Sequence, residues 1–266
     1  MRTFVTLGAV VLGASVAKAV DIWSVDGLGL FKFDSASPQN LTRYGAAGVG
    51  LMPGLDFASD GTLYGFSFGG LYAFNLQTGA ATQIGPGNLD DEQVLDMSWD
   101  PTRNQMFVIS ASSSDEPHRL RTVNLSTGNT SVVGTLNIPV PALAFGFAVN
   151  AAGTRYLHDA EQGGMMRLNN SLQGTFLGPE GNSIGNLAGM TINWAGDGTW
   201  YHAGLNFDSG RQEIYRINEL NGAGTFIGNI GGPDYEFNFG DIAINPIPEP
   251  TSIALLALGV LVLRRR

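Results

Sequence analysis

The sequence predicts an all-β fold, a five-bladed β-propeller built from short antiparallel strands, and three observations support this prediction. A unit of about 45 residues recurs along the chain, which is the period of propeller blades. Glycine is frequent, at 37 residues, while charged residues make up only 14% of the chain, as expected for short apolar strands joined by tight turns. The first and last units are each incomplete, and they complement one another.

The outer half of each unit predicts a β-hairpin. Residues 71–85 match residues 120–134, and in both an Asn opens a turn that contains Thr-Gly. Asn suits this place because its side chain bonds the backbone two residues further on, and Gly provides a positive φ. Weaker copies of the hairpin occupy residues 30–45, 165–178 and 214–228.

The inner strand of each unit repeats as well, at residues 55–64, 95–100, 146–150, 191–194 and 240–245. The first unit, residues 20–45, contains three strands but no inner strand, whereas residues 239–245 contain the inner strand alone. Joining these two ends completes a four-stranded blade and closes a ring. An open β-solenoid is the alternative, but it would need shorter, more regular coils and would not explain the split units.

The beginning of the chain predicts a signal peptide over residues 1–19. Arg2 provides a positive start, residues 4–16 are apolar, and Ala17 and Ala19 form a small-x-small cleavage site. An N-terminal membrane anchor that stays uncut is the alternative. The predicted propeller domain then covers residues 20–246.

The end of the chain, residues 247–266, has three parts. Residues 253–263 form a short apolar segment, which as a helix falls short of the ~20 residues that a bilayer core requires. We expect this sorting helix to sit transiently in a membrane, with its basic end on the cytoplasmic side, until the tail is removed. The polar residues on either side of the segment are Pro248, Glu249, Pro250, Arg264, Arg265 and Arg266.

This tail resembles the PEP-CTERM sorting signal of Gram-negative bacteria, which an exosortase recognises. The resemblance covers only the last 20 or so residues and rests on the Pro-Glu-Pro triplet, the apolar segment and the terminal arginines. It implies export across the inner membrane, processing near Pro250, and residence at the cell surface or in extracellular polysaccharide. A plain short membrane anchor is the alternative. The repeats resemble a broad group of exported bacterial propellers, which implies the fold and little more.

Charge and composition narrow the partners. The chain carries a net charge of −9, and its ends contribute +2 (residues 1–19) and +3 (residues 251–266), which leaves −14 between them. Such a surface repels nucleic acid and anionic lipid. The absence of cysteine excludes disulfides and thiol chemistry.

Three aspartates of the inner strands, Asp56, Asp96 and Asp241, share one column of the repeat. Carboxylates gathered near the central channel could hold Ca²⁺, which prefers oxygen ligands. The simpler interpretation is that each aspartate bonds a turn or the backbone of the neighbouring blade. No other cofactor is expected.

Trp200 and His202 are candidate ligand-binding residues, because aromatic rings can stack on sugars, although packing between blades is the more ordinary role. The acidic stretch 88–92 is either a solvated loop or part of a binding face. Residues 65–69 match the Gly-x-Ser-x-Gly pattern of hydrolases, but they lie between two predicted strands, without the helix that a nucleophile elbow needs. No catalytic residue is therefore predicted.

The predicted function is that of a non-enzymatic, exported propeller that binds glycan or protein at the cell surface or in the matrix. The alternative is a Ca²⁺-dependent propeller hydrolase or lyase that acts on an extracellular small molecule or polysaccharide.

Overall fold

The computed structural model describes residues 19–139, 141–142, 144–181, 187–195, 198–206, 208–232 and 239–245. Most of the predicted signal peptide, including Ala17, lies outside these residues, as does the whole predicted sorting tail, residues 247–266. In the described part of the chain, no helix has the length and apolar character that a membrane crossing requires.

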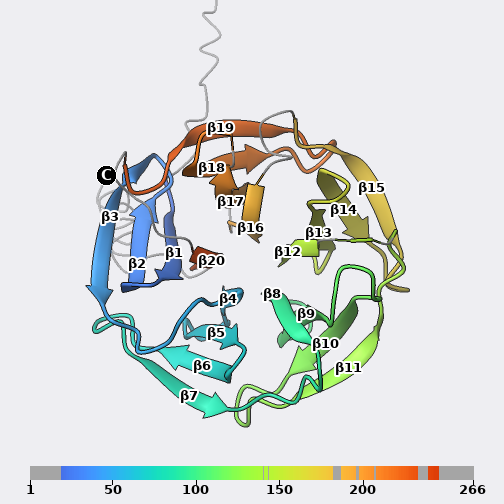
Figure 1. The fold of residues 1–266 in the computed structure, drawn as a ribbon, viewed down its shortest axis with the longest axis horizontal. Coiled ribbons are helices and arrows are strands. Elements are labelled where there is room, and N and C mark those ends of the chain that lie inside the picture. Colours follow the sequence, from blue (N-terminus) through green and yellow to red (C-terminus); the bar gives the residue numbers. More distant parts are fainter. Residues whose placement is uncertain are drawn as a thin grey trace, which may run out of the picture.

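Five four-stranded antiparallel sheets form the blades of a propeller, as the sequence predicts (Figure 1). Each sheet is ordered from an inner strand at the centre to an outer strand at the rim. Blade 1 consists of β20 (Phe239–Ile244), β1 (Asp21–Asp26), β2 (Gly29–Asp34) and β3 (Ser37–Gly45). Blade 2 consists of β4 (Gly54–Phe57), β5 (Leu63–Ser67), β6 (Gly70–Phe74) and β7 (Ala81–Gly85).

Blades 3, 4 and 5, like blade 2, each consist of four consecutive strands. Blade 3 consists of β8 (Gln93–Asp100), β9 (Gln105–Ala111), β10 (Arg119–Val123) and β11 (Thr130–Thr135). Blade 4 consists of β12 (Ala144–Val149), β13 (Arg155–Asp159), β14 (Gly164–Leu168) and β15 (Gly174–Pro179). Blade 5 consists of β16 (Leu187–Trp194), β17 (Trp200–Asn206), β18 (Arg211–Ile217) and β19 (Gly224–Asn229).

The ring is closed by blade 1, whose inner strand comes from the far end of the chain. β20 pairs antiparallel with β1, with Ile22 opposite Ile244 and Trp23 opposite Ala243. The split first and last units are therefore two parts of one sheet, which confirms the predicted closure and excludes the solenoid.

The hydrophobic core is divided among the spaces between blades. Successive residues of a strand point to opposite faces of the sheet, so each blade packs one set of side chains against each neighbour. In β13, Tyr156 belongs to a cluster with Trp200 of blade 5, whereas Leu157 packs with Phe107 of blade 3.

The glycines of the repeat lie where blades approach most closely. Gly79 has φ 77° in the turn that Asn75 opens, and a Cβ there would lie 2.8 Å from the Gly45 carbonyl oxygen of blade 1. A Cβ on Gly85 would lie 1.9 Å from the Thr127 carbonyl oxygen of blade 3. The turn at Gly79 therefore needs glycine both for its backbone conformation and for the spacing between blades, whereas Gly85, at the end of β7, needs it for the spacing alone.

Candidate functional site

The three inner-strand aspartates connect neighbouring blades. Asp56 accepts a hydrogen bond from the backbone N–H of Trp99 in blade 3, at 2.7 Å. Asp96 accepts one from Phe147 in blade 4, at 2.6 Å, and Asp241 accepts one from Leu55 in blade 2. Each carboxylate therefore bonds the inner strand of the next blade, which explains why the aspartates recur with the repeat.

The other contacts of these aspartates are also within the ring. The other carboxylate oxygen of Asp56 accepts a bond from the amide of Asn193, on the inner strand of blade 5. The same amide donates to the Ile242 carbonyl group of the neighbouring blade 1. Burial raises the pKa of Asp56 to about 6, against hydrogen bonds that lower it. Burial, together with the nearby Asp241 carboxylate, raises the pKa of Asp96 well above its usual value. The structure thus brings Asp96 and Asp241 together at the channel.

A second cluster of ionisable groups lies between blades 4 and 5. It consists of His158 on β13, His202 on β17, and Glu180 immediately after β15. Oε2 of Glu180 lies 3.1 Å from Nε2 of His158 and 2.8 Å from Nδ1 of His202. All three side chains are 0% exposed. Among the described residues, this is the one group of three His, Asp or Glu side chains whose ligand atoms converge, within 4.8 Å of one another.

The strand register explains how the two histidines meet. On β13, Tyr156 and His158 point toward blade 5; on β17, Trp200 and His202 point toward blade 4. The rings of Tyr156 and Trp200 lie 4.5 Å apart between centroids, and those of His158 and His202 are also 4.5 Å apart. The two pairs are successive layers of the same contact between blades.

The charge balance in this cluster is incomplete. Burial would raise the pKa of Glu180, but interactions with His158 and His202 outweigh it and lower the pKa to about 2. Those interactions require protonated imidazoles, whereas burial lowers the pKa of His202 and so favours its neutral form. The carboxylate is therefore buried beside His202, whose own burial opposes the positive charge that would compensate it.

Trp200 and His202, the candidate ligand-binding pair, are both buried in this space between blades. Trp200 packs on Tyr156 and contributes to the core of blades 4 and 5. Both side chains therefore lie inside the protein. His158 and Glu180 were not among the residues singled out from the sequence.

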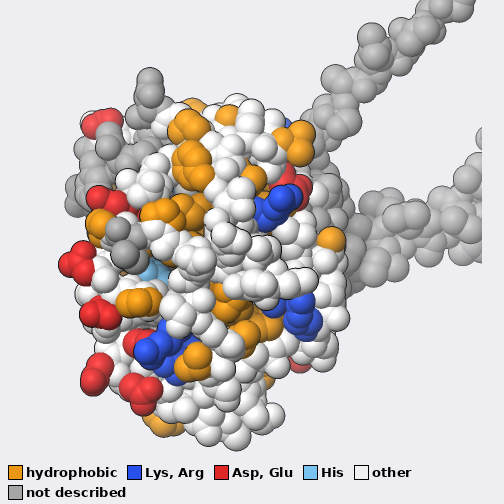
Figure 2. Space-filling view, turned by 90° about the vertical axis from the view of Figure 1, so that its right-hand side faces the viewer, with side chains coloured by type: hydrophobic (Ala, Val, Ile, Leu, Met, Phe, Trp, Pro, Cys, Tyr) orange, Lys and Arg blue, Asp and Glu red, His pale blue; other side chains and the backbone are white. Residues whose placement is uncertain are grey.

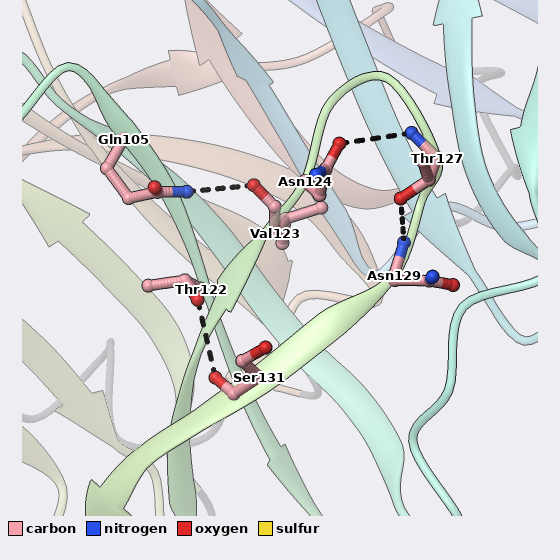
Figure 3. A pocket seen from close by; sticks show the side chains of 7 residues that line it. All are labelled: Gln105, Thr122, Val123, Asn124, Thr127, Asn129 and Ser131. Atoms are coloured by element: carbon pink, nitrogen blue, oxygen red, sulfur yellow. Dashed lines mark hydrogen bonds between the residues drawn. The ribbon is translucent and has the colours of Figure 1, made fainter.

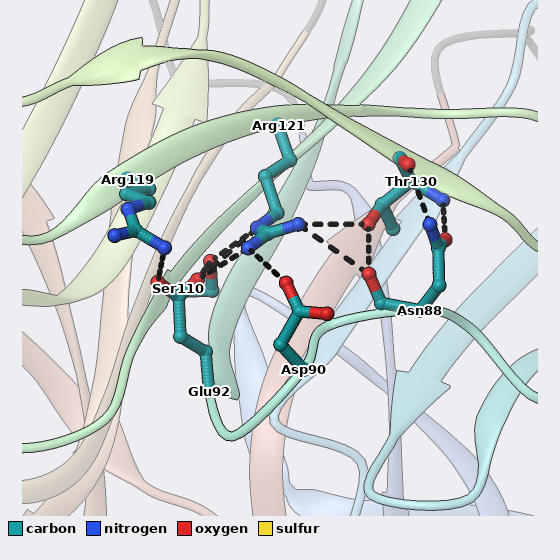
Figure 4. A network of polar contacts seen from close by, with 7 residues as sticks. All are labelled: Asn88, Asp90, Glu92, Ser110, Arg119, Arg121 and Thr130. Carbon is teal, nitrogen blue, oxygen red and sulfur yellow. Dashed lines mark hydrogen bonds and ion pairs between the residues drawn. The ribbon is translucent and has the colours of Figure 1, made fainter.

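The acidic stretch 88–92 is not simply a solvated loop. The side chain of Glu92 is only 8% exposed and pairs with Arg121, which is 3% exposed (Figure 4). Ser110 donates a hydrogen bond to the same carboxylate, and Arg119 pairs with its other oxygen. The loop is held in place because a buried arginine needs a buried acidic partner.

Two of the open depressions formed by the described residues lie on the surface of blades 2 and 3. One, of about 400 Å³, is lined by amide and hydroxyl groups around the β10–β11 turn, many of them engaged in bonds within that turn (Figure 3). The other, of about 420 Å³, lies between residues 86–92 and the ring of Phe68, which is 67% exposed. Acidic side chains gather along one face of the disc, at the left edge of Figure 2.

These features define the class of protein: a five-bladed β-propeller with carboxylates that join its inner strands and a buried His–Glu cluster between two blades. The chain belongs to the family described as a domain of unknown function, DUF4394, which matches residues 29–243. No curated protein matches the sequence.

Several solved structures share the fold at low sequence identity. A chain of a nidogen–laminin complex is 10% identical, with a TM-score of 0.54, over 86% of this chain and 98% of that one. A protein of unknown function from Bacteroides thetaiotaomicron is 13% identical, with a TM-score of 0.51, over 86% of this chain and 65% of that one. Regucalcin from Agrobacterium tumefaciens, described as a calcium-binding protein, is 13% identical, with a TM-score of 0.48, over 86% of this chain and 80% of that one. At these identities the likeness shows the fold alone.

Proposed function

We propose that the protein is an exported, non-enzymatic propeller that serves as a binding or structural component of the surface or extracellular polysaccharide of a Gram-negative bacterium. The observation that carries the non-enzymatic part is the use of the channel carboxylates. Asp56, Asp96 and Asp241 each accept a backbone hydrogen bond from the next blade, so these groups brace the ring.

The export route rests on the two ends of the sequence. Residues 1–19 have the features of a signal peptide, and the Pro-Glu-Pro tail resembles an exosortase signal. Intact-mass measurement of the protein from its native host should give a chain that begins near Val20 and ends near Pro250. A Glu249→Gln variant should keep its tail. Finding the native product inside the cell with Arg266 attached would refute this route.

We place polysaccharide binding at the depression beside Phe68. An exposed aromatic ring offers a stacking surface for a sugar, and the neighbouring exposed carboxylates of Asp90 and Asp91 can accept hydrogen bonds from its hydroxyl groups. Affinity electrophoresis in gels that contain the host exopolysaccharide should show retardation that Phe68→Ala abolishes. Phe226→Ala is the matched control, because Phe226 is similarly exposed but lies on β19. Equal retardation of both variants and the parent would refute this assignment.

A Ca²⁺-dependent hydrolase or lyase is the second candidate, and the closeness of Asp96 to Asp241 at the channel favours it. The two candidates differ in their response to Ca²⁺, because an ion that binds only the folded state raises the melting temperature. We expect no change between chelator and millimolar Ca²⁺. A rise that Asp96→Asn removes would favour the enzyme.

A further inference from the structure

We propose that His158, Glu180 and His202 bind one divalent transition-metal ion of the Zn²⁺ class, which joins blade 4 to blade 5. Two imidazole nitrogens and one carboxylate oxygen form a ligand set that Zn²⁺ accepts, with bonds of roughly 2.0–2.2 Å. The site is independent of the proposed export and binding roles.

The spacing of the three groups is close to what coordination requires. Ligand atoms arranged tetrahedrally around Zn²⁺ lie roughly 3.3 Å from one another, given the usual bond lengths. Here the Glu180 oxygen lies 3.1 Å from the His158 nitrogen and 2.8 Å from the His202 nitrogen. These two separations need to change by only a few tenths of an ångström, while the two imidazole nitrogens, which lie within 4.8 Å of each other, would move together to complete a three-ligand site.

The hydrogen bonding of the cluster supports the same conclusion independently. Both ring nitrogens of each histidine and both oxygens of Glu180 are buried without a hydrogen-bond partner, although the groups lie within ion-pair distance. Leaving a buried carboxylate without hydrogen bonds is costly, and a cation at the centre of the three groups would satisfy it.

The ligand types also indicate which metal fits. Ca²⁺ and Mg²⁺ prefer oxygen ligands, whereas imidazole suits Zn²⁺ and related transition metals. The cluster is thus chemically distinct from the channel aspartates, whose ligand atoms are all oxygen.

The position of the ligands indicates a structural role for the ion. His158 belongs to blade 4 and His202 to blade 5, while Glu180 lies in the segment that follows blade 4. The backbone N–H of Glu180 donates to the Gly163 carbonyl group of blade 4, and its carbonyl group accepts a bond from Gly224 of blade 5. A metal at this point would cross-link the two blades and add its binding free energy to folding.

Refolding with defined metals tests the proposal. The full chain is unfolded in the presence of chelator and refolded alone, with Zn²⁺, or with Ca²⁺ at the same concentration. We expect one equivalent of Zn²⁺ to remain after dialysis and to raise the melting temperature, and Ca²⁺ to do neither. Failure to retain Zn²⁺, or an equal effect of Ca²⁺, would overturn the proposal.

Three variants locate the bound ion. His158→Gln and Glu180→Gln should weaken Zn²⁺ binding by more than roughly 100-fold. Loss of a residue that only supports a metal ligand costs up to roughly 100-fold in affinity, and loss of a ligand itself should cost more. His118→Gln is the matched control, because His118 is also buried but lies outside the cluster. Binding that is unchanged in Glu180→Gln, or lost in His118→Gln, would contradict the assignment.

A measurement on the parent protein covers the case in which the cluster variants do not fold. With Co²⁺ in place of Zn²⁺, we expect visible absorption of a tetrahedral nitrogen–oxygen site and shifted NMR signals from two of the three histidines. Shifts of His118 alone, or of no histidine, would overturn the proposal.

Discussion

Single glycines of this repeat do more than permit turns. Gly85 ends the outer strand of blade 2 and lies against the turn of blade 3, where a side chain has no room. The recurrence of such glycines is visible in the sequence, but their role between blades is not, because it depends on contacts between separate sheets.

Gly85→Ala should destabilise the protein by about 1–3 kcal/mol, because the new Cβ would meet the Thr127 carbonyl oxygen and force the blades apart. Gly50→Ala is the control, since a Cβ there has nothing within 4 Å, and it should change stability by less than about 0.5 kcal/mol. Urea unfolding measures both. Equal midpoints for the two variants would show that the approach at Gly85 is not tight.

The raised pKa of the buried Asp56 side chain predicts that the stability of the fold depends on pH. Its pKa is raised from 3.8 to about 6 in the folded state, so the folded protein holds this proton more strongly than the unfolded chain does. The resulting contribution to stability is complete below about pH 4 and is lost as the pH rises through 6.

Relative to Asp56→Asn, the parent protein should therefore gain up to about 3 kcal/mol of stability as the pH falls from 7 to about 4. Histidines titrate in both proteins, so their effect cancels in the difference. Urea unfolding at several pH values gives the two curves. A constant gap between them would mean that Asp56 is not protonated in this range.

At the level of strands, most of the fold can be predicted from the sequence. The complete buried cluster of ionisable groups between blades 4 and 5 cannot. The Asn-x-x-Thr-Gly turns mark the outer hairpins of blades 2 and 3, and a single Asn or Asp opens the turn in the other three, because turn chemistry is local. Gly153 and Gly198 occupy equivalent positions, two residues before β13 and β17. His158 is the fifth residue after Gly153 and His202 the fourth after Gly198, so the two side chains point to opposite faces of equivalent strands. Because opposite faces of neighbouring blades pack together, an alignment of the repeats is enough to predict that these two histidines face one another. Glu180 could not be found this way, because it lies between blades where the repeat has no column.

The contribution of the buried ion pair between Arg121 on β10 and Glu92 in the 88–92 loop can be measured by substitutions on β10. Arg121→Met should cost about 3–5 kcal/mol, because it leaves Glu92 buried without its enclosed partner. Arg119→Met should cost no more than about 1 kcal/mol, since Arg119 is 44% exposed while pairing with the same carboxylate. Thermal unfolding of both variants would decide, and equal losses would contradict the role given to burial.

The molecule as a whole depends on the pairing of β20 with β1. A chain that stops before Phe239 loses the inner strand of blade 1 and should not fold cooperatively. A circular permutant that starts in the loop before β4, with a short linker from Asn245 to Val20, should fold and melt within a few degrees of the parent, because blade 1 becomes continuous. Circular dichroism during heating measures both. A folded truncation would show that the ring does not need its closing strand.

The same pairing determines the orientation of the propeller relative to a support to which the C-terminal end of the chain is attached. Ile22 lies opposite Ile244, so the start of β1 and the end of β20 lie side by side at one end of the inner strands. A molecule tethered beyond residue 246 would therefore turn this end of the inner strands toward its support, and a ligand from solution would meet the opposite face of the propeller first.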